Sequence, residues 1–383
     1  MMALRYLVRR VMTAHSRIYK VLVISDYRSV NSSRPEAEIF IRMAQLGHDI
    51  TILSFPDASY YNDRFRAAGI QVIEKHPTKK FSRPFISFLK NLVKENQYDV
   101  LHAFNSQGLV NATWALQGLP TKLIGYRGYA GQTHWYDPMM YLKYFHPRVD
   151  NIIALSDIIK KVLVQNMIWG KNKVTRIHKG HDPNWYKDVQ PADRKEFGFN
   201  ENDILLCFLA NVRPFKGLPY LMQATHEIPA DLPLHFLFIG NGYEENNIRE
   251  MMAQSPYQKK FHLLGYRKDS QNILAMSDGL VLSSTHGESL TKSVIEAMSL
   301  GIVPIITDIE GNRGVVIDGD SGWVVPAKDP TALAKAITEF VNNPAERKRR
   351  GENARKHIAE HFHTAQTVDE FLKLYEKLTR SET

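Results

Sequence analysis

Two glutamates, Glu288 and Glu296, stand eight residues apart at a turn that the sequence places between a strand and a helix. The run before them, Asp278–Ser284, is apolar and typical of a buried parallel strand, and the run after them keeps apolar residues at helical spacing until Gly301. We expect Glu288 on the loop at the carboxyl end of that strand, and Glu296 about two turns down the helix. Ligands bind at this edge of open α/β sheets.

The start of the same helix suits a phosphate. The backbone N–H groups of Leu290, Thr291 and Lys292 are expected to point out of the helix N-terminus, where the helix dipole and unpaired donors attract anions. The side chain of Lys292 has two open interpretations, a further phosphate contact or a solvated charge. The sequence therefore predicts a phosphate site beside the two glutamates.

With Gly287 before Glu288 and Ala-Met-x-x-Gly after Glu296, the pattern resembles the E-x7-E signature of retaining GT-B glycosyltransferases of the large family 4 type. The resemblance implies that Glu296 hydrogen-bonds ribose hydroxyls and that Glu288 faces the transferred sugar. It places further nucleotide-sugar contacts on Ser289, Leu290, Thr291 and Lys292. The family often has glycine or an aromatic residue just after the first glutamate, where this chain has Ser289. Two solvated surface charges are the alternative interpretation of the glutamate pair.

Sugar transfer from a nucleotide needs positive charge beside the departing diphosphate. The segment Asn211–Gly217 is similar to the family's Arg/Lys pair, here Arg213 and Lys216, which clamps the donor phosphates without a metal. In this chain the arginine lies three residues before the lysine, whereas the commoner pattern has it five before. The alternative is two solvated basic residues beside a turn. The resemblance implies a nucleoside diphosphate sugar as substrate, with no cofactor and no metal.

Two further turns belong to the predicted donor site. Gly240 and Gly242 follow the strand that ends at Ile239, and by resemblance they let the backbone approach the donor. The backbone at Tyr266 and Arg267 is expected to meet the nucleotide base, whose identity the sequence leaves open.

The first half of the chain departs from the family pattern. Where many relatives have a glycine pair after the first strand, this chain has Asp26–Arg34, in which Arg28, Ser32, Ser33 or Arg34 are the candidates. The usual active-site histidine is missing from its place, which reads Tyr126–Gly131. Arg28, Arg127 and His134 are therefore the candidates for the acceptor side. His102 is a further candidate, and for both histidines a structural role is the alternative. Aromatic residues crowd the segment 126–145, where contact with sugar rings, contact with a lipid acceptor and core packing are all open.

Alternating strands and helices predict two α/β domains, each with a parallel sheet. The resemblance implies the GT-B architecture, two doubly wound Rossmann-like domains facing a central cleft. The expected boundaries are an extension at 1–18, an acceptor-side domain at 19–182, a polar linker at 183–201, a nucleotide-sugar domain at 202–362, and a final helix at 363–383 that crosses back to the first domain. The first helix of the acceptor-side domain is expected near Pro35–Leu46.

Composition narrows the class of protein. The chain has 383 residues, a net charge of +9, and a single cysteine, Cys207, in an apolar run that predicts a buried thiol and fits a reducing compartment. No run of 18 apolar residues is present to span a membrane. Residues 1–20 contain five basic residues and no acid, and the remaining chain has 44 basic and 40 acidic residues, a near balance that argues against nucleic-acid binding.

The extension at 1–18 is expected to form a basic amphipathic helix with leucine and valine on one face and arginine on the other. Binding to an anionic membrane surface, packing on the protein and organelle targeting are all open interpretations. The expected location is the cytoplasm, with peripheral attachment to the inner face of the membrane as one possibility.

The favoured hypothesis is a retaining glycosyltransferase that moves a sugar from a nucleoside diphosphate sugar to a glycan or lipid-linked acceptor, in synthesis of cell-surface polysaccharide or glycolipid. The alternatives are a non-catalytic GT-B subunit that binds a nucleotide or a partner, and a GT-B nucleotide-sugar epimerase. The intact Glu288 and Glu296 argue against the non-catalytic subunit, and the missing glycine pair allows it.

Overall fold

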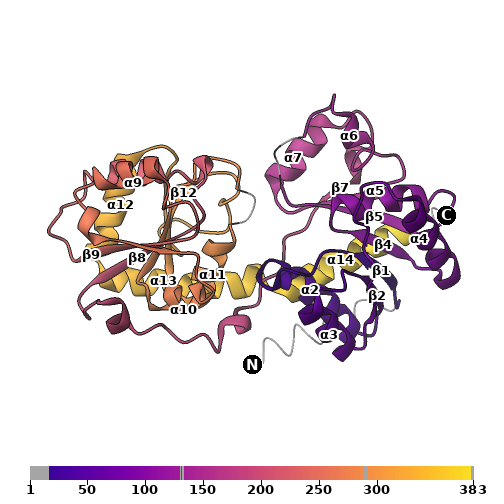
Figure 1. The fold of residues 1–383 in the computed structure, drawn as a ribbon, viewed down its shortest axis with the longest axis horizontal. Coiled ribbons are helices and arrows are strands. Elements are labelled where there is room, and N and C mark those ends of the chain that lie inside the picture. The colour runs from indigo at the N-terminus through magenta and orange to yellow at the C-terminus, as the bar shows by residue number, and fades with distance from the viewer. Residues whose placement is uncertain (1–16, 130, 132, 289–290, 381–383) are drawn as a thin grey trace. The chain divides into compact units, whose positions relative to one another are not determined.

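The computed structural model describes residues 17–129, 131, 133–288 and 291–380, and the chain divides into two compact units (Figure 1). Unit 1 comprises residues 1–180 and 362–383, and unit 2 comprises residues 181–361. Each is an α/β unit with a parallel sheet, which confirms the predicted Rossmann-like fold class. Of the extension predicted at 1–18, only Arg17 and Ile18 are among the described residues. Its helix and its membrane contact therefore stay predictions.

The described part of unit 1 has a seven-stranded sheet in the order β3-β2-β1-β4-β5-β6-β7, and every neighbouring pair is parallel. Its strands are β1 (Lys20–Ile24), β2 (Asp49–Leu53), β3 (Gln71–Ile73), β4 (Val100–Ala103), β5 (Lys122–Arg127), β6 (Asn151–Ala154) and β7 (Val174–Arg176). After its first residue β1 is fully buried, because parallel strands are covered by helices on both faces.

The helices of unit 1 are α2 (Val30–Gln45), α3 (Ser59–Ala67), α4 (Arg83–Asn96), α5 (Ser106–Ala115), α6 (Pro138–Tyr141), α7 (Asp157–Asn166) and α14 (Thr364–Thr379). The last of them, α14, packs against α2 although the two are far apart in sequence (Figure 1). Val368, Phe371, Leu372 and Tyr375 of α14 are buried in the core of unit 1, and Leu378 packs partly buried against it.

The start of α2 differs from the prediction, which placed it near Pro35. The helix begins at Val30 and carries Pro35 inside it. A proline early in a helix removes one hydrogen bond, a smaller loss than leaving the whole turn from Val30 unformed. Ser33 and Arg34 are therefore helical residues, and Ser33 Oγ donates to the carbonyl oxygen of Asp26 at 3.1 Å.

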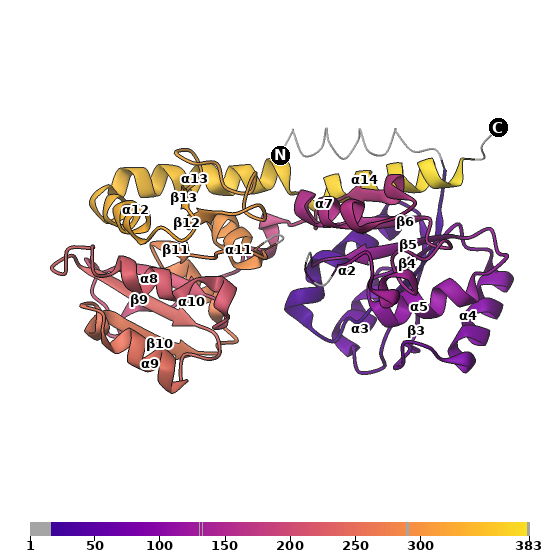
Figure 2. The same ribbon diagram turned by 90° about the horizontal axis from the view of Figure 1, so that it is seen from above.

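The described part of unit 2 has a six-stranded parallel sheet in the order β10-β9-β8-β11-β12-β13. Its strands are β8 (Ile204–Leu209), β9 (Leu234–Ile239), β10 (Phe261–Gly265), β11 (Gly279–Leu282), β12 (Val303–Asp308) and β13 (Trp323–Pro326), and β13, β12, β11, β9 and β10 can be followed in Figure 2. Its helices are α8 (Leu218–Ala224), α9 (Asn246–Ala253), α10 (Ser270–Met276), α11 (Lys292–Leu300), α12 (Pro330–Asn342) and α13 (Pro344–His361). Cys207 on β8 is fully buried, as predicted, and burial raises the pKa of its thiol.

The stretch 183–201, for which the sequence predicted a linker, belongs to unit 2. It contains two 3-10 helices, η2 (Pro183–Tyr186) and η3 (Arg194–Phe197). Arg194 fixes the second of them: its guanidinium donates to the carbonyl oxygen of Met276 at 3.0 Å and to Asp278 Oδ2 at 2.9 Å. Polar composition did not predict this attachment, because polar side chains such as Arg194 make the hydrogen bonds that hold the stretch to unit 2.

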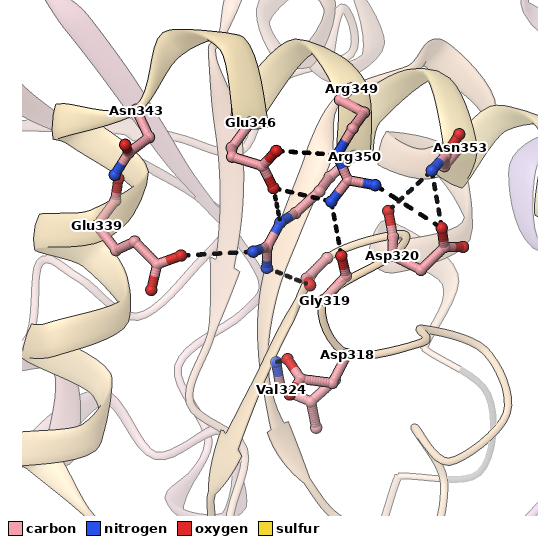
Figure 3. A network of polar contacts seen from close by, with 11 residues as sticks. Asp318, Gly319, Asp320, Val324, Glu339, Asn343, Glu346, Arg349, Arg350 and Asn353 are labelled. Carbon is pink, nitrogen blue, oxygen red and sulfur yellow. Dashed lines mark hydrogen bonds and ion pairs between the residues drawn. The ribbon is translucent and has the colours of Figure 1, made fainter.

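Helices α12 and α13 are joined to the sheet of unit 2 by an arginine network (Figure 3). Arg350 is 8% exposed, donates to the carbonyl oxygen of Gly322 at 3.0 Å, and lies 3.9 Å from the ring centroid of Trp323. Hydrogen bonds from Arg349 and Arg350 lower the pKa of Glu346 to about 2. The network fixes α13 against the sheet. Within the described residues, no helix is long and apolar enough to span a membrane.

Candidate active site

The candidate site lies at the point where the strand order of unit 2 reverses. From β8 the chain continues outward to β9 and β10, whereas β11 lies on the other side of β8. The loops that leave β8 and β11 diverge from the same carboxyl edge, and such a switch point is where open α/β sheets bind ligands. The two loops are bonded to each other: Thr285 N donates to the carbonyl oxygen of Phe215 at 2.8 Å, and Ser283 Oγ donates to that of Gly217 at 2.8 Å.

Gly217 makes this close approach possible. It follows the 3-10 turn η4 (Pro214–Lys216) with φ of 70°, in the left-handed region. A Cβ atom added there would lie 1.8 Å from the carbonyl oxygen of Ser283, a backbone atom that cannot move aside alone. The glycine therefore sets the position of Lys216 relative to the end of β11.

Lys216 and Glu288 form the central ion pair of the site. Lys216 Nζ lies 2.5 Å from Glu288 Oε1, and the two side chains are 14% and 11% exposed. Ser284 Oγ donates to the same carboxylate oxygen at 3.1 Å. The sequence placed these residues 72 positions apart on two separate motifs, and the structure brings them together. A sheltered ammonium group can hold phosphate charge, and the carboxylate beside it can accept hydrogen bonds from sugar hydroxyls.

Gly240 and Gly242 shape the neighbouring loop after β9. Gly240 has φ of 142°, and a Cβ atom added there would lie 2.3 Å from the carbonyl oxygen of Ala210. Asn241 N donates to Asn211 Oδ1 at 2.9 Å, so the loops after β8 and β9 hold each other. Both glycines have the positive φ that the close-approach prediction needs. Arg213 is the N-cap residue that precedes η4, and its exposed side chain makes no ion pair with any described residue.

Glu296 lies on α11 and is 5% exposed. Its Oε1 is 3.2 Å from Lys292 Nζ and accepts a hydrogen bond from Gln271 Nε2 at 3.1 Å. Because α11 begins at Lys292, Glu296 is about one turn into the helix, and the predicted two turns are wrong. The Lys292 side chain is 44% exposed and pairs with Glu296, an arrangement that neither interpretation of this lysine anticipated.

Thr291 precedes α11 and is buried. Its hydroxyl donates to Asn312 Oδ1 at 3.1 Å, and Asn312 Nδ2 donates to the carbonyl oxygen of Thr307 at 3.0 Å. This chain of bonds joins the start of α11 to the loop after β12. Ser289 and Leu290, also predicted to contact the nucleotide sugar, lie outside the described residues.

Tyr266 and Arg267 follow β10 at the same edge of the sheet. The Tyr266 side chain is exposed, and Arg267 forms a two-pronged pair with Asp269, at 2.8 Å and 2.7 Å. This hydrogen bonding lowers the pKa of Asp269. The Arg267 guanidinium therefore binds within its own loop. The contact between the backbone of Tyr266 and Arg267 and the nucleotide base stays a prediction.

On unit 1, the predicted residue Arg28 is bound within its own loop. Its Nε and Nη2 donate to Asp26 at 2.9 Å and 2.7 Å, and these bonds lower the pKa of that carboxyl group. The guanidinium carbon lies 4.0 Å from the ring centroid of Phe55. Arg28 is thus positioned at the carboxyl edge of β1, with its charge balanced by a neighbour.

Arg127 is the last residue of β5, and His134 lies on the segment that follows it. Arg127 Nη2 donates to the carbonyl oxygen of Gly131 at 2.6 Å and to Thr133 Oγ1 at 3.2 Å, so this side chain holds the loop that follows it. His134 is exposed and stacks on Tyr136 with ring centroids 5.1 Å apart. Among the described residues, no hydrogen bond or ion pair joins Arg28, Arg127 and His134 to one another.

His102 is a core residue. It is fully buried among the rings of Phe40, Phe104 and Phe371, and burial lowers its pKa to about 3. The structural interpretation of this histidine therefore holds.

Sequence reasoning missed His76, which stands at the edge of unit 1. Its Nδ1 lies 2.9 Å from the carbonyl oxygen of Pro77 and its Nε2 lies 2.9 Å from Asn105 Nδ2, an arrangement that suits the neutral ring. Burial lowers its pKa to about 4. The ring stacks on Phe55 at 4.1 Å, the same ring that Arg28 contacts. No spacing in the sequence links these residues, because they come from four separate loops, after β1, β2, β3 and β4.

Comparison with known proteins decides the family. Residues 189–357 match the family described as "Glycosyl transferases group 1", and residues 37–185 match "Glycosyltransferase Family 4". The chain belongs to the family 4 glycosyltransferases. The predicted resemblance to this family is confirmed. The second match covers most of the first half of the chain, where the motifs depart from the family pattern.

The chain is similar to glycosyltransferases of archaea and bacteria. An uncharacterized glycosyltransferase of Methanocaldococcus jannaschii is 27% identical over 62% of this chain, which spans 60% of that protein's length. The UDP-Gal:alpha-D-GlcNAc-diphosphoundecaprenol alpha-1,3-galactosyltransferase of Escherichia coli is 24% identical over 84% of this chain and 86% of its own length. Among solved structures, Anabaena HepE in complex with UDP has a TM-score of 0.77 at 16% identity, covering 94% of this chain and all of that one, which shows a shared fold.

Proposed function

We propose that this protein is a retaining glycosyltransferase that moves a sugar from a nucleoside diphosphate sugar to a glycan or lipid-linked acceptor. The observation that carries the proposal is the ion pair between Lys216 and Glu288 at the switch point of unit 2. Both side chains are largely shielded from solvent, and the close approach at Gly217 holds their loops together. The cation can bind the diphosphate of the donor, and the carboxylate can bind its sugar.

In the proposed reaction, Lys216 faces the diphosphate. As the bond between the anomeric carbon and the phosphate oxygen breaks, negative charge grows on the leaving diphosphate, and a fixed ammonium group stabilises that charge more than it stabilises the intact donor. Glu288 orients the sugar hydroxyls and offsets positive character at the anomeric carbon. Arg213, which is exposed beside η4, is a second candidate for the phosphates.

Retention of configuration follows from attack on the face that the diphosphate leaves. The acceptor oxygen forms its bond to the anomeric carbon as the phosphate oxygen departs, and the acceptor's proton moves to that phosphate oxygen. Glu288 is a poor nucleophile in this setting, since one of its oxygens already accepts from Ser284 and pairs with Lys216. This is why we favour a single front-face step over a covalent glycosyl-enzyme.

The nucleotide is proposed to lie along α11, with its ribose on Glu296 and its phosphates near the helix N-terminus. UDP sugars are the first donors to test, because the name of the Escherichia coli relative specifies UDP-galactose and the Anabaena structure holds UDP. The lipid diphosphate in the name of the same relative supports a lipid-linked acceptor for this chain.

The test is a thermal-shift panel of UDP, GDP, ADP and CDP on the full chain and on Glu296→Ala. A ligand that binds only the folded state raises its stability by RT ln(1 + [L]/Kd), so one nucleotide should stand out and lose its effect in Glu296→Ala. Glu352→Ala, which removes an exposed carboxylate of α13, should respond as wild type does. Equal shifts from all four nucleotides, or a shift that Glu296→Ala keeps, would reject the site; no shift at all would favour a non-catalytic subunit.

A further inference from the structure

Six large apolar side chains are exposed on two segments of unit 1, and we call them the aromatic patch. They are Tyr129, Trp135, Tyr136, Leu142, Ile168 and Trp169, and their exposed fractions run from 43% to 65%. Four of the six are Trp or Tyr. They come from the segment between β5 and β6 and from the turn after α7, and Figure 1 shows α6 and α7 next to each other in unit 1.

Hydrogen bonds and a ring contact join the two segments of the patch. Trp135 N donates to Asn166 Oδ1 at 3.2 Å, and the Tyr141 hydroxyl donates to the carbonyl oxygen of Trp135 at 2.7 Å. The ring of Tyr141 also lies 5.2 Å from that of Trp169. Met140 beneath them is buried in the core. These contacts hold Trp135 and Trp169, one from each segment, on a surface that the core supports.

The charge beside the patch is positive. Lys143 follows Leu142, and Lys171 follows Trp169 at two residues' distance. Partial burial lowers the pKa of Lys143, Lys80 and Arg127 lower it further, and Asp137 raises it, so three basic groups and one carboxylate lie near one another there. The one carboxylate of the first segment, Asp137, accepts from Met139 N at 2.9 Å as the cap of α6. The patch thus joins exposed Trp and Tyr rings to lysines.

We propose that the aromatic patch inserts into the interface of an anionic phospholipid membrane and seats unit 1 on it. Trp and Tyr rings gather at the headgroup level of membranes, where one end is apolar and the other is wet. Each lysine near an anionic surface adds on the order of 1 kcal/mol of attraction. A protein partner fits less well, because lysine is depleted at protein interfaces. Single exposed apolar side chains need no partner, but a contiguous group of them indicates a binding surface.

This membrane contact goes beyond the proposed reaction, since it assigns a surface and a partner that the donor site does not require. It is also distinct from the predicted role of residues 1–18, which lie on another part of the sequence. Every experiment below keeps that segment intact, so that a loss of binding reports on the aromatic patch alone.

The experiment is flotation of the full chain with phosphatidylcholine vesicles, with and without phosphatidylglycerol. The test variant carries Trp135→Ser and Trp169→Ser together, and Trp114→Ser is the matched control, because Trp114 is 45% exposed on unit 1 outside the patch. We expect wild type and control to float with the anionic vesicles. The double variant should bind at least about tenfold more weakly, because it lacks two rings that would insert into the membrane interface.

Insertion is separated from simple charge attraction by quenching. Brominated lipids should quench the fluorescence of wild type, and the double variant should lose most of that quenching. An unchanged thermal shift with the nucleotide shows that the double variant is folded, and a Lys216→Ala enzyme that is inactive should still bind vesicles, so failure of the reaction does not count against the patch.

Three outcomes would overturn the proposal. Equal flotation of wild type and double variant would place membrane binding elsewhere, and absence of flotation by wild type would exclude it. Sedimentation that shows a dimer of wild type, lost in the double variant, would make the patch an interface between two copies of the chain.

Discussion

The two units have similar sheets and different chemistry at their switch points. In unit 2 the loops after β8 and β11 each contribute one charge, Lys216 and Glu288, and the pair joins the two loops. In unit 1 the switch lies between β1 and β4, and Arg28 after β1 pairs with Asp26 of its own loop. A shared topology therefore creates a place for a ligand in both units, and the loops decide which charges are presented there.

Glycine makes the second difference. The edge of unit 2 has Gly217, Gly240 and Gly242 at positive φ, each so close to a neighbouring loop that a Cβ atom would collide. After β1 of unit 1 stands Tyr27, which is 1% exposed and packs edge-on against Phe65 at 4.8 Å. At the carboxyl edge of the sheet, unit 2 therefore presents backbone atoms, whereas unit 1 has a buried aromatic side chain after β1. This is a physical reason to assign the sugar nucleotide to unit 2.

The largest expected effect comes from removing the cation of unit 2. Lys216→Ala should lower kcat on the order of 10³-fold, because the developing diphosphate charge loses its fixed partner. Nucleotide affinity, measured by thermal shift, should change far less. Lys259→Ala, an exposed lysine of the same unit, is the matched control and should keep wild-type kcat. The activity of wild type should also persist in EDTA.

Two results would contradict the assignment of the reacting cation to unit 2. A Lys216→Ala enzyme with wild-type kcat would mean that the pair with Glu288 is only structural. An Arg28→Ala enzyme with the larger loss of kcat would move the reacting phosphate to unit 1.

The next effect tests the glycine difference. Gly217→Ala should lower the free energy of unfolding by roughly 3–5 kcal/mol, since the new methyl group meets the Ser283 carbonyl oxygen at a left-handed backbone position. Gly198→Ala is the control: its φ is 79° and nothing lies within 4 Å of the added atom. It should cost only the backbone strain of about 1 kcal/mol. Urea unfolding of both variants separates collision from strain, and equal losses would show that the contact with β11 is soft.

Much of unit 2 could be predicted from sequence because its site is local. Glu288, Lys216 and the two glycines each follow a strand within a few residues, and an apolar strand with a turn after it is readable from one chain. The β/α order then sends all these turns to one edge of a sheet. The pairing of Lys216 with Glu288 was not predicted, since it depends on which strands are neighbours, and β8 and β11 are far apart in sequence.

What escaped prediction depends on tertiary packing. Gln271 holds Glu296 from a different helix, and His76 meets Asn105 from a different loop. The stretch 183–201 has the composition of a linker, yet the bonds of Arg194 tie it to unit 2. None of these leaves a periodic or spaced signal, because each contact joins residues whose separation along the chain is arbitrary.

The two units also differ in how their sheltered carboxylates are paired. In unit 2, Glu288 and Glu296 each pair with a lysine, whereas in unit 1 Glu36 of α2 is 6% exposed and its Oε1 has no hydrogen bond within the described residues. Burial is the main reason that the pKa of Glu36 is raised to about 7. Lys179, Ser25 and Tyr27 lower this pKa, and Asp26 raises it. Burial raises the pKa of the Tyr126 hydroxyl, and the nearby charge of Glu36 raises it further.

This raised pKa makes the stability of unit 1 depend on pH. The folded state keeps the proton of Glu36 between about 4.5 and 7, where the unfolded chain releases it, so the stabilising contribution is complete below 4.5 and is lost as the pH rises through 7. Glu36→Gln, which stays neutral, should therefore gain up to about 3 kcal/mol over wild type at pH above 8 and little at pH 4. Glu38→Gln removes a carboxylate of the same helix that pairs with Arg64 at 2.6 Å, and it should show no gain in that window. Unfolding of the three proteins across this range decides the point: a constant difference between Glu36→Gln and wild type would mean that Glu36 is ionised throughout and that Lys179 outweighs its burial, which would make unit 1 resemble unit 2.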